Sequence, residues 1–432
     1  MGRKIIITVL STFRKKKDGT PDDPITYKGG GINVEANWTN EAGLRYLLKK
    51  DEYTDIIYLC SEATSSSEYK DRIEKIVEPY GIKMTDVPYS INDDVKDISR
   101  KLTEKFEFHS SDTVYIDTTG GFRTITYYLV YLFRYLEYIG VRVESAIYSQ
   151  IEMGKNEGIF KNVKDNFRMF DLINGAHEFT STGNPRTLKE YFRSSGNKTI
   201  KNLLKAMQKF YDQISLCRIG EELDKSLTDM ERCLRKIEEN SDPSDDEARL
   251  KEIIPVIREK FFSDNKSRYL GLMKWCINNG LLQQALTLYV EKMPKAYFKE
   301  LDFLCDDDVI DFSEDGIGHP ENKGHDMYHD YFLKIIDRIS VPNVRLDMEH
   351  ISYKDIKKLC FDYIYMKIVR NYVNHASEKN YKSYNERNRE QMLVTENPSL
   401  YKFPNGNNFA AEDIKTFMRQ SVQYIEEINV KK

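Results

Sequence analysis

The chain has 432 residues, 31% of them charged, and a formal net charge of only -4. This length allows two or three domains with their own cores, and the near balance of charge excludes a chain that binds nucleic acid over its whole surface. No stretch is long enough to span a membrane, and the six scattered cysteines form no CxxC pair. We therefore expect a cytoplasmic protein with reduced thiols and no membrane partner.

The first part of the chain, to about residue 175, alternates short β-branched runs with helical patterns. The predicted strands are 5–10, 55–60, 113–117 and 141–148. The predicted helices are 40–50, 67–80, 93–106 and 124–138. This order predicts a Rossmann-like α/β domain, a parallel sheet with helices on both faces. The three glycines at 29–31 have no fingerprint spacing and predict a flexible loop.

The rest of the chain is almost entirely helical in pattern, which predicts an all-α C-terminal domain. The predicted helical stretches are 187–237, 245–262, 267–292 and 351–375. A long polar segment, 306–330, interrupts them. It contains His319, His325 and His329, and the last two have the i,i+4 spacing of a metal pair. We favour a solvent-exposed loop and predict no metal site.

Hydroxyls and glycines follow the predicted strands where each strand ends. In an open α/β sheet, ligands bind at this edge, near the switch in strand order. Paired glycines let backbone amides approach a ligand, a helix N-terminus attracts phosphate, and an arginine adds a charged donor. We predict a polyphosphate or oligonucleotide site formed by Ser11, Thr12, Thr118, Thr119, Gly120, Gly121, Phe122 and Arg123. The alternative is that the glycines only make a tight turn and the hydroxyls cap helices.

A helical segment near the end of the chain, Arg370 to His375, suits metal-independent RNA cleavage. His375 can move a proton near neutral pH, and Arg370 can hold a phosphate and offset the charge of the transition state. Asn371 lies one helical turn before His375, where it can orient the ring. These three residues are the predicted catalytic set.

The spacing of this motif is not specific, because Arg345 and His350 have the same separation. Two acidic residues between them would repel a phosphate, whereas Arg370 ends a long apolar helical pattern. The alternative for this motif is that Arg370 and His375 are ordinary, partly exposed helical residues.

Three segments together resemble a known family. Asp117 to Thr124 resembles the ligand loop of CARF domains, the Rossmann-like sensors of CRISPR-associated accessory proteins. Trp275 to Glu291 is similar to a helical stretch that follows such domains. Arg370-Asn371-x-x-x-His375 matches the motif of HEPN ribonucleases. The order CARF then HEPN is that of type III CRISPR accessory ribonucleases. One departure is the long, acidic segment 306–330, which matches nothing in that family.

The resemblance implies an antiviral endoribonuclease activated by a cyclic oligoadenylate, with cyclic tetra-adenylate favoured and cyclic hexa-adenylate as the alternative. It implies a sensing domain at 1–178, a helical connecting region at 179–300 and a ribonuclease domain at 301–432. The substrate would be single-stranded RNA, the product a 2′,3′-cyclic phosphate, and no cofactor or metal would be required. Because one helix supplies a single arginine and histidine, we also expect a homodimer with a shared cleft.

Two other functions are compatible with the sequence. The chain would be a non-catalytic nucleotide sensor or regulator if its helical half only dimerises, although no basic recognition helix is evident. Alternatively, the sensor half itself would degrade the bound messenger.

Overall fold

The computed structural model describes residues 2–12, 16–65, 67–121, 123–152, 157–262, 268–300, 303–305, 332–333, 336–337, 344–346, 352–374, 384–403 and 409–430. The chain divides into two compact units, Met1–Asp171 and Leu172–Lys432. The boundary falls within helix α6 (Lys164–Thr182), as does the predicted division at 178/179.

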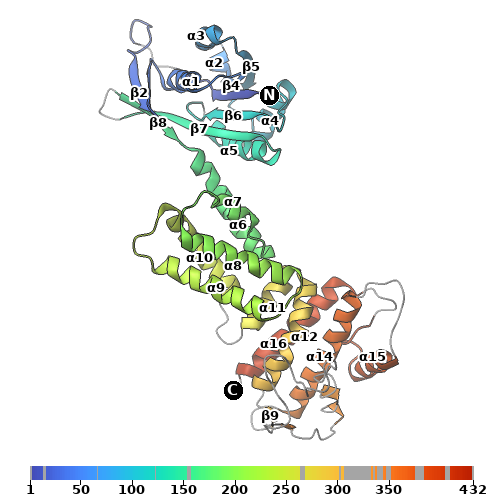
Figure 1. Ribbon diagram of the computed structural model, residues 1–432. Coiled ribbons are helices and arrows are strands. Elements are labelled where there is room, and N and C mark those ends of the chain that lie inside the picture. Colours follow the sequence, from blue (N-terminus) through green and yellow to red (C-terminus); the bar gives the residue numbers. More distant parts are fainter. Residues whose placement is uncertain are drawn as a thin grey trace. The chain divides into compact units, whose positions relative to one another are not determined.

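The first unit contains an eight-stranded sheet in the order β3-β2-β8-β7-β6-β1-β4-β5 (Figure 1). The strands are β1 (Lys4–Val9), β2 (Ile25–Gly29), β3 (Ile32–Ala36), β4 (Asp55–Ser61), β5 (Lys83–Tyr89), β6 (Thr113–Asp117), β7 (Arg142–Ile151) and β8 (Glu157–Asn162). From β5 to β7 all neighbours are parallel, so the predicted Rossmann-like core is confirmed. The whole sheet is mixed, because β7–β8 and β2–β3 pair antiparallel.

The prediction that Gly29 to Gly31 form a flexible loop is wrong. Gly29 ends β2, and Gly30 and Gly31 make the two-residue turn into β3. Both turn glycines have positive φ, +55° and +77°. A turn with two such residues matches the twist of antiparallel strands, so the paired glycines favour a hairpin.

Helices cover both faces of the sheet. They are α1 (Thr39–Lys50), α2 (Glu62–Ser65), α3 (Ser67–Val77), α4 (Val95–Lys105) and α5 (Arg123–Tyr138), with a short 3₁₀ helix at Glu78–Tyr80. In β1, Ile5 and Ile7 face the core under α4 and α5, while Ile6 faces the core under α1 and α3. A central parallel strand is therefore apolar on both sides, which explains the unbroken isoleucine run.

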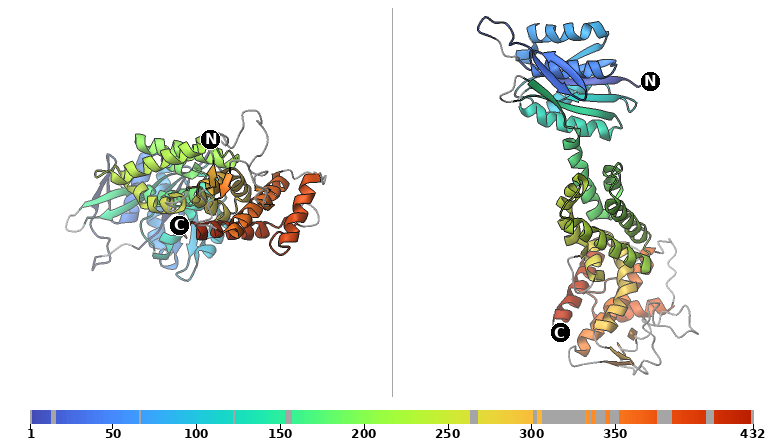
Figure 2. Two further views of the ribbon diagram at one scale, coloured as in Figure 1. Left: turned by 90° about the horizontal axis from the view of Figure 1, so that it is seen from below. Right: turned by 60° about the vertical axis from the view of Figure 1, so that its left-hand side comes forward.

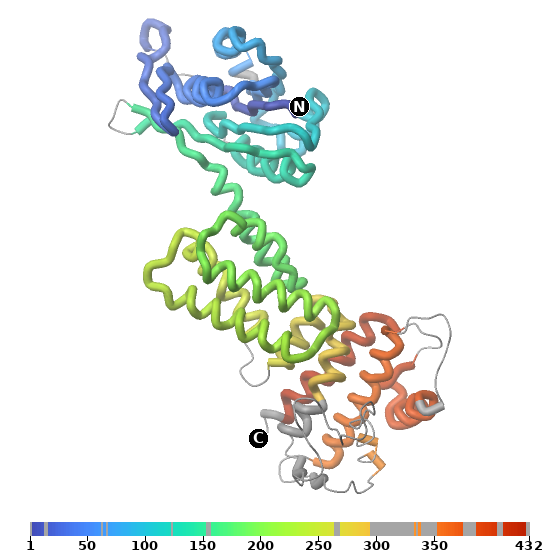
Figure 3. Tube along the Cα trace, viewed as in Figure 1, coloured from blue at the N-terminus to red at the C-terminus, as the bar shows by residue number. Residues whose placement is uncertain are grey.

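The second unit is mainly helical (Figures 2 and 3). Its helices after α6 are α7 (Arg186–Tyr191), α8 (Lys198–Ser215), α9 (Glu221–Glu239), α10 (Asp245–Phe262), α11 (Arg268–Asn278), α12 (Leu282–Glu300), α14 (Tyr353–Asn374), α15 (Tyr384–Glu396) and α16 (Ala411–Val430). The all-α prediction needs one correction, because β9 (Phe303–Cys305) pairs antiparallel with β10 (Val344–Leu346). Arg345, whose spacing to His350 imitates the ribonuclease motif, lies in β10 rather than in a helix.

No helix within the described ranges is both long and apolar enough to cross a membrane. The cysteines that the structure describes in full, at 60, 217, 233, 276 and 360, are free thiols.

Candidate functional site

The two predicted parts of the ligand site lie at the switch in strand order. β1 is paired with β4 on one side and with β6 on the other, and Ser11 and Thr118 follow the carboxyl ends of β1 and β6. This edge is where an open α/β sheet binds ligands. The structure thus brings together two segments that are more than a hundred residues apart in the chain.

Asn40, in the first turn of α1, joins these two segments. Its Nδ2 donates to the carbonyl oxygen of Val9 at 2.6 Å and to that of Thr119 at 2.5 Å. Its Oδ1 accepts a hydrogen bond from the hydroxyl of Ser11. Asn40 is 1% exposed, so this carboxamide fixes the two loops from beneath.

Gly120 and Gly121 both need to be glycine. Their φ angles are +90° and +79°, in the left-handed region that side chains disfavour. A Cβ on Gly120 would lie 2.6 Å from Asn40 Oδ1 and 2.8 Å from Ser11 Oγ. These glycines thus make a tight strand–helix turn, and the same turn keeps the loop close to Ser11.

Asp117 supports the loop from its base. It is fully buried at the end of β6, where its Oδ1 accepts from the Thr119 amide at 3.0 Å and its Oδ2 from the Thr8 hydroxyl at 3.3 Å. The Thr119 hydroxyl in turn accepts from the Ser149 amide at 2.8 Å, which connects the loop to β7. Desolvation outweighs these hydrogen bonds and raises the pKa of Asp117 to about 7.

The raised pKa of Asp117 predicts a pH dependence of stability. Since the folded-state pKa, about 7, lies above the ordinary value of 3.8, folding favours the protonated form. The free energy of unfolding should therefore fall as the pH rises between these values, by at most about 1.4 kcal/mol per pH unit. Urea denaturation from pH 4 to 8 measures this slope. Asp117→Asn should make this slope smaller, whereas Asp165→Asn, at an exposed position, should leave it unchanged. Equal slopes in wild type and Asp117→Asn would contradict the assignment.

For the other predicted ligand residues, the structure gives less support for a place in the ligand site. Thr118 donates its hydroxyl to the carbonyl of Ile147 at 2.9 Å, so it stabilises the sheet, and Thr12 is exposed. Phe122 and the side chain of Arg123 lie outside the described residues, although Arg123 begins α5.

Arg370 lies in the last turns of α14, where α12 holds it. Its Nη1 forms an ion pair with Glu291 Oε1 at 2.7 Å, and its side chain is 20% exposed. Its Nε and Nη2 point to Asn371 Oδ1 at 3.4 and 3.3 Å, which are long and therefore weak hydrogen bonds. Glu291 thus fixes one edge of the guanidinium, while the other edge is held only loosely.

His375 lies outside the described residues, so its predicted contact with Asn371 stays a prediction. The residue before it is fixed, because Gln283 of α12 donates to Asn374 Oδ1 at 3.1 Å. Two contacts with α12 therefore hold the end of α14 just before the predicted catalytic histidine.

The centre of α14 contains a buried polar network around Asp362, which is 0% exposed. Its Oδ2 accepts from Lys358 Nζ at 2.7 Å and from the Ser421 hydroxyl at 2.9 Å, and its Oδ1 accepts from the Tyr401 hydroxyl at 3.0 Å. Tyr289 of α12 joins through Ser421 at 2.7 Å. Burial raises the pKa of Asp362, although the hydrogen bonds from Lys358, Ser421 and Tyr401 act to lower it. The network connects α14 with α12 and α16.

The supporting roles of three residues in the candidate sites were not predicted from the sequence. These residues are Asn40, Asp117 and Glu291. Asn40 stood at the start of a predicted helix, where it looked like an ordinary helix-start residue. Glu291 is 79 positions from Arg370, and no local pattern links them. Within the described ranges no cluster of His, Cys, Asp or Glu is arranged to hold a metal, and the histidines at 319, 325 and 329 fall outside those ranges.

Among known proteins, similarity to this chain is found in solved structures. No family model and no curated protein matches the chain. Among solved structures, the chain is similar to Enterococcus italicus Csm6 bound to cyclic hexa-2′-fluoro-hexa-dAMP. The identity is 11%, the match covers 98% of this chain and 100% of that chain, and the TM-score is 0.38. A TM-score at this level carries no inference about the sites of this chain.

Proposed function

We propose that the chain is a metal-independent endoribonuclease that a cyclic oligoadenylate activates to cleave single-stranded RNA in CRISPR antiviral defence. The observation that carries this proposal is a glycine loop at the switch point of an α/β sheet, in one chain with Arg370 near the end of a helix that leads to His375. The first feature suits a ligand with phosphates, and the second suits phosphodiester chemistry.

The sensor site would use the edge between β1 and β6. Backbone amides of the loop and the start of α5 attract phosphates, and Ser11 and Thr12 offer hydroxyls to ribose. Cyclic tetra-adenylate is the expected ligand and cyclic hexa-adenylate the alternative.

The cleavage step needs only groups of this chain. The ribose 2′-oxygen attacks the adjacent phosphorus as its proton passes to a base, and the bond from phosphorus to the 5′-oxygen breaks as that oxygen gains a proton. The products are a 2′,3′-cyclic phosphate and a 5′-hydroxyl. Arg370 would neutralise the charge of the phosphate, while His375 acts as acid or base or positions the nucleophile.

The experiment that tests this function incubates the purified chain with fluorescent single-stranded RNA and excess chelator, adding each cyclic oligoadenylate in turn. Cleavage that depends on one of them is expected. Since the similar Enterococcus protein is described with a six-membered analogue, the hexa-adenylate is an essential arm of the experiment. Binding of a messenger without any cleavage would instead favour a non-catalytic sensor, and loss of the messenger itself would reveal its degradation by the sensor half.

Gly120→Val should raise the messenger dissociation constant at least about tenfold, because the new side chain would collide with Asn40 and Ser11. Calorimetry measures the change. Gly140→Ala is the matched control, since Gly140 also has a positive φ, +84°, yet a Cβ there would meet only Ser110 at 3.4 Å. Arg123→Ala should also weaken binding but recover much activity at saturating messenger. If Gly120→Val bound messenger like the wild type, the loop would not belong to the site.

A homodimer is proposed because one helix surrounds a phosphate with only one arginine and one histidine. The chain should sediment as a dimer without messenger. Mixing wild type with an excess of His375→Ala should lower activity beyond dilution. A monomer that cleaves at the full rate would require Arg370 and His375 to act within one chain.

A further inference from the structure

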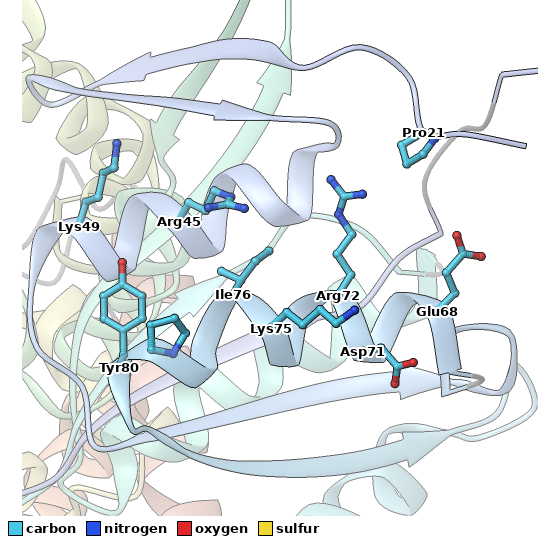
Figure 4. Close-up of a pocket in the computed structure, with 10 residues that line it drawn as sticks. Pro21, Arg45, Lys49, Glu68, Asp71, Arg72, Lys75, Ile76 and Tyr80 are labelled. Atoms are coloured by element: carbon cyan, nitrogen blue, oxygen red, sulfur yellow. The ribbon is translucent and has the colours of Figure 1, made fainter.

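A groove separate from the switch-point edge lies between α1 and α3, on one outer face of the first unit (Figure 4). Its volume is about 760 Å³, which falls within the range of sites for small organic ligands. Its lining residues are Pro21, Arg45, Lys49, Glu68, Asp71, Arg72, Lys75, Ile76, Pro79 and Tyr80. Neither the sensor site nor the cleavage site uses any of them.

Two arginines from opposite walls are held in place by a single buried carboxylate. Glu41 is 2% exposed, and it accepts from Arg45 at 2.8 Å and from Arg72 at 3.1 Å. Arg72 also donates to the side chain of Asn37 and lies 4.7 Å above the ring of Trp38. Both guanidiniums are therefore oriented before any ligand arrives, which lowers the entropic cost of binding an anion.

The groove carries more positive charge than the buried carboxylate of Glu41 neutralises. Arg45 bonds Glu41 through Nε and Nη2, which leaves its Nη1 without a partner among the described residues. Lys75 is exposed, and Lys49 reaches only the carbonyl of Asn33, at 2.9 Å. These groups are donors for an oxyanion, most simply a phosphate.

The groove also offers apolar surface next to the cations. Tyr80 is 53% exposed, and Ile76 and Pro79 line the same wall. In Figure 4 Tyr80 and Lys49 lie towards one end, and the acidic Glu68 and Asp71 lie towards the other. An exposed tyrosine ring is a surface on which a nucleobase stacks, and the acidic end would repel a phosphate.

We infer that this groove binds a nucleotide unit, with its base against Tyr80 and its phosphate between Arg45, Lys49 and Lys75. The unit comes either from a free nucleotide or from a linear RNA strand that crosses the groove. The two sources share the same chemistry of one aromatic base and one phosphate.

The test measures binding of inorganic phosphate, AMP, and a linear fluorescent ten-nucleotide RNA to the full chain in its Arg370→Ala form, so that no probe is cleaved. Lys49→Glu combined with Lys75→Glu should weaken AMP binding at least about tenfold. The matched controls are Lys96→Glu alone and Lys96→Glu combined with Lys161→Glu, a second charge reversal at an exposed lysine. Lys96 lies on α4, which covers the other face of the sheet. Tyr80→Ala should weaken AMP but not inorganic phosphate, and Tyr80→Phe should restore AMP binding.

Tight AMP binding would indicate that the groove binds a free nucleotide. Weak AMP binding, together with RNA binding that is lost in the double variant, would indicate that it binds a linear RNA strand. Unchanged affinity of all probes in Lys49→Glu/Lys75→Glu, or equal loss in the Lys96→Glu controls, would overturn the inference. Because Arg123 begins α5, which packs on the other face of the sheet, AMP binding that survives Arg123→Ala separates this groove from the sensor site.

Discussion

Arg370→Ala is expected to lower messenger-activated RNA cleavage by about 10²–10³-fold, because it removes the charge that would stabilise the phosphate in the transition state. Messenger affinity should stay at the wild-type level, since the sensor residues belong to the first unit. Initial rates with fluorescent single-stranded RNA and saturating messenger measure the first effect, and calorimetry measures the second. His375→Ala should be inactive in the same way.

Arg419→Ala is the matched control for this substitution. Arg419 belongs to the same unit, and among the described residues it approaches only Asn278, at 3.4 Å, so its loss should leave the rate nearly unchanged. His350→Ala should also have little effect. An active His375→Ala together with an inactive His350→Ala would show that the motif at 345–350 is the catalytic one.

Asp362→Ala is expected to destabilise the second unit by about 3 kcal/mol, because it leaves buried hydroxyls and Lys358 without their shared acceptor. Asp362→Asn should cost less, since its carbonyl still accepts one hydrogen bond. Urea denaturation in a Trp38→Phe background follows this unit alone, because Trp275, buried in α11, is then the only tryptophan.

Glu412→Ala serves as the control for that measurement. Glu412 lies on α16 with its side chain 80% exposed, so its loss should leave the urea midpoint unchanged. A midpoint for Asp362→Ala equal to that of Glu412→Ala would mean that the buried network does not stabilise the fold.

The sequence predicted the strands whose two faces are both buried. β1, β4 and β6 are rich in β-branched residues because helices cover both sides of them. β5 was missed because it contains Pro88 and is buried at only two of its seven positions. β2, β3 and β8 were missed because their short, half-polar patterns resemble loops, and only their mutual pairing makes them strands.

The residue types of the candidate sites could be predicted from the sequence, but the residues that hold those sites in place could not. The glycine loop could be located because parallel strands place their carboxyl ends at one edge. Asn40 and Glu291 could not be found, since their roles depend on contacts with residues far away in the chain. Asp117 was visible as the last residue of a strand, but its raised pKa follows from burial that only the folded sheet creates.

The network at the centre of α14 restricts how this helix can move. Asp362 and Arg370 are eight residues apart, which in an α-helix corresponds to about 12 Å along the axis and about 80° around it. Turning α14 about its own axis would pull Asp362 away from Ser421 and Tyr401 and leave a carboxylate buried without donors. The helix therefore has a fixed rotational phase. Under the proposed activation, a change at Arg370 would move α14 together with α12, α16 and Tyr401, or act beyond Asn374.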